Sequence, residues 1–233
     1  MIISINQPAY LPWLGYFDRI ARSDLHIVLD HVKLEHNTST SFTNRNKIRQ
    51  KTGWSWLTVP ILTKGRQQGM AISDIEVDMR QHWQTKHWSS LSNTYSRAVY
   101  FADYREELAT IYQRPVHKLT EIIERLNNFL LSKFEIKTPL LYSSTLAVTK
   151  TKSSLVLELC QQVGAKEYLS GPFGRDYLDL ESFEHAGIKV IWHDYQHPEY
   201  KQHHPNFEPY MGAIDLLFNH GINARALLLG NKS

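Results

Sequence analysis

The sequence contains one cysteine, Cys160, and no long apolar run. A single cysteine excludes an internal disulfide framework and is typical of a protein that folds in a reducing compartment. The longest uncharged run, residues 1–17, includes Asn6, Gln7 and two prolines and has no basic start. Such a run is neither a secretory signal nor a membrane helix. We therefore expect a cytoplasmic protein without a membrane span.

An excess of charge of either sign is also lacking. The 233 residues carry 26 basic and 23 acidic side chains, and a net charge of +3 does not by itself define a nucleic-acid-binding protein. With 42% apolar residues the chain can bury a core without disulfides or a metal, which excludes intrinsic disorder. We expect a single domain over residues 1–233.

Basic residues are nevertheless concentrated in one segment. No acidic residue lies between Glu35 and Asp74, whereas six Lys and Arg residues lie there. A local field of this sign attracts phosphates or carboxylates, although a solvated basic hairpin has the same composition. The segment therefore favours a small anionic substrate, such as a nucleotide or sugar nucleotide, over nucleic acid.

The pattern of apolar runs predicts an α/β fold with a parallel-sheet core. Residues 1–6 and 25–29 are predicted strands on either side of a helix at 13–22, and this βαβ order favours parallel pairing. A second βαβ-like unit is expected at 167–192. The other expected elements are a β-rich basic insert at about 32–78 with strands at 54–60 and 72–77, a helical segment at about 81–134 whose last helix starts at Pro115, and helices at 151–163, 180–186, 211–219 and 223–229.

The segment after the first strand has a composition suited to ligand binding. Open α/β sheets bind ligands in the loops that follow their strands. Gln7, Tyr10, Trp13 and Tyr16 lie in this position and offer polar groups and aromatic rings with polar edges. The alternative is a rigid turn whose aromatics belong to the core.

Two further loops carry candidate binding residues. In the first, Arg45 and Lys47 alternate with Asn44 and Asn46, a set that suits phosphate or carboxylate, or an exposed β-turn. In the second, residues 170–179 contain two glycines directly after a predicted strand, which frees backbone amides to approach a ligand. The second loop lacks the Gly-Lys-Ser/Thr ending of a phosphate-binding loop.

Histidines are frequent near the end of the chain. His193, His197, His203 and His204 lie within twelve residues and suit zinc or another divalent metal, which keeps a metal-dependent hydrolase open as a further hypothesis. No HExxH pair accompanies them, and we assign no metal ligand. His197 is instead expected to be a general base, because an imidazole titrates near neutral pH.

Several segments together resemble the WbqC-like protein family. The resemblance rests on residues 7–17 (QPAYLPWLGYF), 42–48 (FTNRNKI), 168–179 (YLSGPFGRDYLD), 197–202 and 214–221, with Asp30, the strand at 54–60 and Phe207 between them. It covers almost the whole chain in the expected order. Gly212 departs from the pattern, since a serine is expected there.

This family occurs with gene clusters for O-antigen and other surface polysaccharides, including lipopolysaccharide. The resemblance implies a transferase that moves glycine, another amino acid or an acyl group to a sugar nucleotide or glycan precursor. In our leading hypothesis His197 is the catalytic base, oriented by Asp179 or Asp215. The expected substrate-binding residues are Gln7, Tyr10, Trp13, Tyr16, Asp30, Asn44, Arg45, Asn46, Lys47, Ser170, Gly171, Tyr177, Tyr200 and Gln202.

The opening strand–helix–strand unit is also similar to the nucleotidyltransferase-like HUP fold, which includes pantothenate synthetase. This similarity implies ATP and Mg²⁺ as cofactors that activate a carboxylate. The HxGH histidines of that fold are replaced here by residues 13–16 (WLGY), so Arg45 or Lys47 is expected to supply the cation. The alternative from another class is a non-catalytic module that binds nucleic acid or polysaccharide through residues 45–66.

Overall fold

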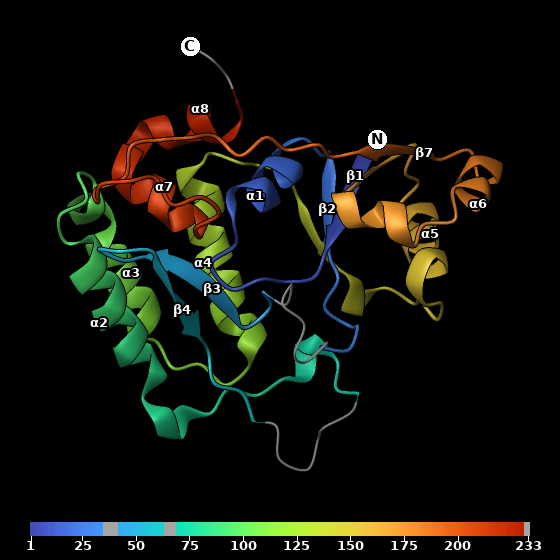
Figure 1. The fold of residues 1–233 in the computed structure, drawn as a ribbon. Helices are drawn as coiled ribbons and strands as arrows, with labels where there is room; N and C mark the ends of the chain where they lie inside the picture. Colours follow the sequence, from blue (N-terminus) through green and yellow to red (C-terminus); the bar gives the residue numbers. More distant parts are fainter. Residues whose placement is uncertain (35–41, 63–68, 231–233) are drawn as a thin grey trace.

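A five-stranded parallel sheet forms the centre of the computed structural model, which describes residues 1–34, 42–62 and 69–230 (Figure 1). β1 (Ile2–Asn6) lies in the middle, between β2 (Leu25–Val28) and β6 (Glu167–Ser170), and β5 (Leu140–Tyr142) and β7 (Lys189–Trp192) are the edges. In chain order these strands run 3-2-1-4-5, the order of doubly wound nucleotide-binding folds. The predicted α/β class with a parallel sheet is confirmed.

The order of the strands defines where a ligand is expected. From β1 the chain winds outward to β2 and β5, and it then returns to β6, on the other side of β1, before β7. The carboxyl ends of β1 and β6 are therefore the topological switch point, where the flanking loops diverge and leave a crevice. The loops that follow these two strands start at Gln7 and Gly171.

The two faces of the sheet differ in character. Ile3, Ile5 and Ile27 point to one face and pack with α5 (Lys152–Gln162) and α6 (Leu180–His185). Because side chains alternate along a strand, Ser4 and its neighbours face the other way, towards α1 (Leu14–Ala21) and α4 (Leu119–Lys133). The helices therefore cover both faces, as Figure 1 shows.

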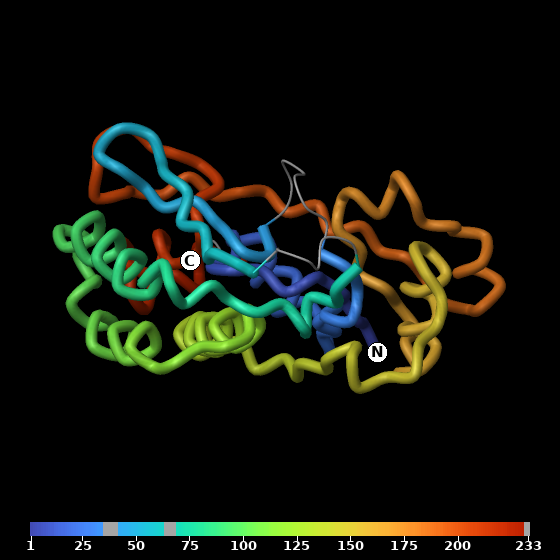
Figure 2. Tube along the Cα trace, turned by 90° about the horizontal axis from the view of Figure 1, so that it is seen from below, coloured from blue at the N-terminus to red at the C-terminus, as the bar shows by residue number. Residues whose placement is uncertain are grey.

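A second unit packs beside α4. It comprises α2 (Trp83–Tyr95), α3 (Phe101–Gln113) and an antiparallel hairpin of β3 (Arg45–Arg49) and β4 (Trp54–Thr58). Figure 2 shows the chain after β7 running alongside this hairpin before it enters α7 (Ala213–His220) and α8 (Ala224–Leu228). None of the helices in the described ranges has both the length and the apolar character needed to cross a bilayer.

Two local predictions are wrong, and one strand was missed. Residues 72–77 form a 3-10 turn at Ile72–Asp74 followed by isolated bridges, because their partners are single residues and not a neighbouring strand. The helix expected from Pro115 begins at Leu119, since Lys118 is held extended by a bridge to Glu76. The short edge strand β5 was not predicted, and part of the basic insert (35–41 and 63–68) lies outside the described residues.

Candidate functional site

Arg19 is a largely buried cation at the switch point. Its guanidinium donates to Oδ1 of Asn6, the last residue of β1, while its Nε is buried and has no hydrogen-bond partner among the described residues. Burial lowers the pKa of Arg19, and the tyrosine hydroxyls around it offset this only in part. No described carboxylate pairs with it. A buried charge without a counter-ion is costly, and an anionic ligand would relieve that cost.

Gly171 makes the position of Arg19 possible. Its backbone has φ −69°, so the residue is not needed for conformational reasons. A Cβ at this position would overlap Nη1 of Arg19 and lie 3.2 Å from its Cζ. The side chains of Ser170 and Tyr177 belong to the same turn, and Tyr177 interacts electrostatically with Arg19. The predicted residues Ser170, Gly171 and Tyr177 are thus brought together beside a cation that was not predicted.

A histidine–carboxylate pair involves Asp18, the residue before Arg19 on α1. His193 follows β7, its backbone N–H donates to the carbonyl of Ser170, and its Nε2 lies 2.7 Å from Oδ2 of buried Asp18. Burial acts to raise the pKa of Asp18, but hydrogen bonds from His193 and Arg22 outweigh it and the pKa is lowered. Because an ionised carboxylate only accepts, Nε2 carries a proton, and in a neutral imidazole Nδ1 then has the lone pair. Nδ1 has no hydrogen-bond partner among the described residues.

The sheet face beneath α1 is polar at its centre. Ser4 on β1 lies 2.8 Å from Nδ1 of His26 on β2, and Ser23 donates to Ser4 at 2.8 Å. Burial, together with the nearby positive charge of Arg19, lowers the pKa of His26 to about 3. His26 is therefore neutral, and Arg19 is the charged group on this part of the sheet.

The start of α1 is closed by other parts of the protein. Trp13 forms an isolated bridge with Gly212, and a Cβ on Gly15 would lie 2.9 Å from the ring of Tyr195. A side chain at Gly212 would lie 2.9 Å from the carbonyl oxygen of Leu11, which explains why glycine stands there. The first residues of this helix are buried, so its first amides are covered.

Other predicted binding residues stabilise the structure. The hydroxyl of buried Tyr10 is bonded to His87 Nδ1 at 2.7 Å and to the Tyr112 hydroxyl at 2.6 Å. The amides of Asn44 and Asn46 donate to backbone carbonyl groups and fix the hairpin.

Both carboxylate oxygens of Asp30 also accept hydrogen bonds within the protein, whereas Gln7 is exposed. Oδ1 of Asp30 accepts hydrogen bonds from the hydroxyl of Ser143 and the N–H of Ser144, and Oδ2 accepts from the Ser144 hydroxyl at 2.7 Å. These bonds join the ends of β2 and β5. Gln7 lies at the switch point beside Asn6 and stays available to a ligand.

The three predicted catalytic residues do not bond to one another, and each has other hydrogen-bond partners. His197 has its Nδ1 on the carbonyl of Pro198 and its Nε2 on the N–H of Tyr210, so both ring nitrogens are occupied. Asp179 caps α6 by accepting from Ser182. Neither Asp179 nor Asp215 bonds to His197 in the structure, and we place the candidate base at His193 instead.

Asp215 belongs to a buried network that includes two predicted binding residues. Its Oδ2 accepts from the hydroxyl of Tyr200 and from Nε2 of Gln202, both at 2.9 Å. Gln202 accepts in turn from Nε of Arg49, whose guanidinium also reaches the carbonyl groups of Pro205 and the following residue. The network joins the hairpin to the chain before α7.

Two other cations of the basic insert, Arg45 and Lys47, lie on the hairpin. The guanidinium of Arg45 lies 4.6 Å from the ring centre of Trp56, and Nζ of Lys47 lies 4.1 Å from that of Trp54. His193, His197 and His203 bond to different partners, and in the described part of the chain no three His, Cys, Asp or Glu side chains gather as metal ligands.

The fold and site define a doubly wound α/β protein with a largely buried cation, Arg19, at its switch point. The chain belongs to the WbqC-like protein family, whose model matches residues 7–227. An uncharacterised protein of Mycobacterium tuberculosis is 38% identical over 224 residues, which cover 95% of each chain. No solved structure matches this chain significantly.

Proposed function

We propose that this protein is a transferase that binds the phosphate or carboxylate of a small substrate through Arg19. The observation that carries the proposal is this buried guanidinium without a described carboxylate partner, at the point where doubly wound folds bind ligands. The planar guanidinium presents paired N–H groups that match phosphate or carboxylate. A sugar nucleotide satisfies this requirement through its phosphates.

His193 supplies the base that group transfer requires. In the proposed reaction an amine or hydroxyl attacks the carbonyl carbon of an activated amino acid or acyl group, and the bond to the leaving group breaks. Nδ1 of His193 takes the proton of the attacking group, and Asp18 stabilises the resulting imidazolium. On the family resemblance, we further propose that the acceptor is a sugar nucleotide or glycan precursor of surface-polysaccharide synthesis.

ATP and Mg²⁺ have no evident place at the start of α1. Trp13 and Gly15 lie under Gly212 and Tyr195 there, so the amides that hold a triphosphate in comparable folds are covered. We derive no step through ATP and include it only as one of the donors to be tested.

A thermal-shift comparison tests the proposal. The intact protein is titrated with a UDP-sugar, ATP with Mg²⁺ and an acyl-CoA, and products are followed by mass spectrometry. A ligand at a hundred times its Kd adds about 2.7 kcal/mol, or about 5–11 °C in Tm for a chain of this size. We expect a shift with a phosphate-bearing ligand and its loss in Arg19→Ala. The absence of any shift across the three ligand classes would contradict the proposal.

The hairpin surface supports a second candidate function, the binding of an anionic polymer. Arg45 and Lys47, both half-buried, lie over tryptophan rings on one face of the hairpin, where Lys47 supplies a positive charge. Two phosphate contacts would give a log–log salt slope of about −2 on duplex DNA. Binding that weakens with this slope and is lost in Lys47→Ala, but not in Arg19→Ala, would favour this function.

A further inference from the structure

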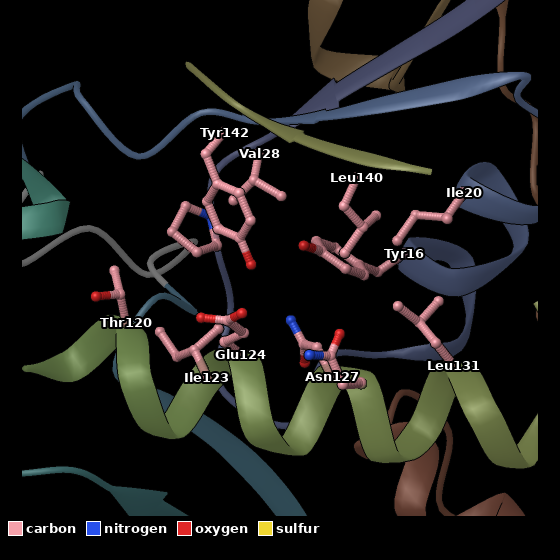
Figure 3. A pocket seen from close by; sticks show the side chains of 12 residues that line it. Tyr16, Ile20, Val28, Thr120, Ile123, Glu124, Asn127, Leu131, Leu140 and Tyr142 are labelled. Carbon is pink, nitrogen blue, oxygen red and sulfur yellow. The ribbon is translucent and has the colours of Figure 1, made fainter. Parts of the chain in front are cut away.

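A pocket lies between α4 and the strands β2 and β5 (Figure 3). Tyr16 and Ile20 of α1 line it, whereas Arg19 bonds to Asn6 at the end of β1. The space open to the centre of a water molecule is about 20 Å³, which admits about one water or a small functional group. Its walls are mainly apolar, and its polar side chains come chiefly from one face of α4.

Asn127 is the buried polar group of this pocket. It is 7% exposed, and its Oδ1 is buried and has no hydrogen-bond partner among the described residues. Figure 3 shows its amide directed into the space between α4 and Tyr16. An unsatisfied buried acceptor costs about 1–3 kcal/mol, so the pocket lacks a donor that a ligand would supply.

Glu124 gives the pocket a negative charge. It is exposed at the mouth, one turn before Asn127 on α4, and it interacts with the hydroxyl of Tyr142 across the pocket. Burial, with added repulsion from Glu124 and Asp30, raises the pKa of Tyr142 to about 12, so this hydroxyl stays neutral. None of the described Lys or Arg residues forms an ion pair with Glu124. A ligand group that matches Asn127 and Glu124 therefore donates hydrogen bonds and carries positive charge.

We propose that this pocket binds a small molecule through a primary ammonium group. The ammonium donates to Oδ1 of Asn127 and lies opposite the carboxylate of Glu124. The ligand class is an amino sugar or an amino acid amide, because a free carboxylate next to the amine would be repelled by Glu124. That this amine is the acceptor in group transfer rests on the proposed function, whereas its binding does not.

Ligand-observed NMR at slightly acidic pH tests the pocket with matched pairs of probes. Glucosamine is compared with glucose, and glycinamide with acetamide. We expect the intact protein to bind the charged member of each pair more tightly. Glu124→Gln should weaken that binding about threefold to fivefold, as for an exposed ion pair. Asn127→Leu should weaken it more than about tenfold.

Three controls keep the test interpretable. Glu121→Gln removes a carboxylate from the same helix but outside the pocket and should bind as the unmodified protein does. Asn127→Asp should tighten ammonium binding, which a folding defect does not explain. Equal binding of charged and neutral probes, or an unchanged affinity in Glu124→Gln, would overturn the inference. If the protein binds nucleotides through Arg19 but does not bind the ammonium probes in this pocket, only the inference about this pocket is refuted.

Discussion

Gly171→Ala is expected to weaken ligand binding while the stability of the protein stays almost unchanged. The backbone of Gly171 has φ −69° and ψ 168°, which alanine adopts without strain. The added Cβ overlaps Nη1 of Arg19, the end of a flexible side chain. The guanidinium must therefore move away from Asn6, while the turn keeps its shape.

The size of each effect follows from the contacts. Loss of one charge-assisted hydrogen bond to an anion costs about 1.5–3 kcal/mol, which is about a 13-fold to 160-fold loss of affinity. Replacing glycine at a compatible position stabilises by about 0.4–1 kcal/mol, and the lost bond between Arg19 and Asn6 offsets this. We therefore expect the free energy of unfolding to change by less than about 1 kcal/mol.

Isothermal calorimetry, with whichever phosphate-bearing ligand shifts the Tm, measures the affinity, and urea denaturation measures the stability. Gly53→Ala is the matched control, because Gly53 has φ +67° with open space around its Cβ position. It should lose about 1–2 kcal/mol of stability and keep its affinity. If Gly171→Ala binds like the unmodified protein, Arg19 does not hold the anion.

Three further predictions concern groups outside the anion contact. His193→Gln should lower kcat of the proposed transfer reaction about 10²-fold to 10⁴-fold with little change in Kd, and unchanged turnover would exclude His193 as the base. Burial raises the pKa of Asp215 from the usual 3.8 to about 6. The free energy of unfolding therefore has its full value below pH 3.8. It falls by about 3 kcal/mol as the pH rises to about 6, because the buried carboxyl group resists ionisation in the folded state. Urea titrations should show that Asp215→Asn lacks this decline, and parallel pH profiles would contradict the assignment. Arg49→Leu should destabilise by about 3–5 kcal/mol, because it leaves buried carbonyl groups without a donor, and denaturation within 1 kcal/mol of the unmodified protein would refute that role.

The central fold was predictable because its signals are local. β1, α1 and β2 each have a clear apolar period bounded by proline or a charge, and their order implies parallel pairing. β5 has three half-buried residues and is a strand only through its pairing with β2. Residues 72–77 have the composition of a strand but no neighbouring strand to pair with, which composition does not reveal.

The site was only partly predictable. The turn at Ser170 and Gly171 was identified from glycines that follow a strand. Arg19, by contrast, lies on a short helix with other charged residues, and its sequence context is that of a solvated face. Its burial depends on Asn6 and on Gly171, which is 152 residues away in the chain. His193 was one of four tail histidines, and its position directly after a strand was the signal that distinguishes it.

The affinity of Arg19→Ala for a phosphate-bearing ligand, measured by calorimetry beside Arg45→Ala, tests the central claim most directly. Arg45 lies over Trp56 on the hairpin. Arg45→Ala is the matched control, because it also removes one arginine side chain. We predict that Arg19→Ala loses about 13-fold to 160-fold in affinity while Arg45→Ala binds as the unmodified protein does. The reverse pattern would contradict the account and place the anion on the hairpin.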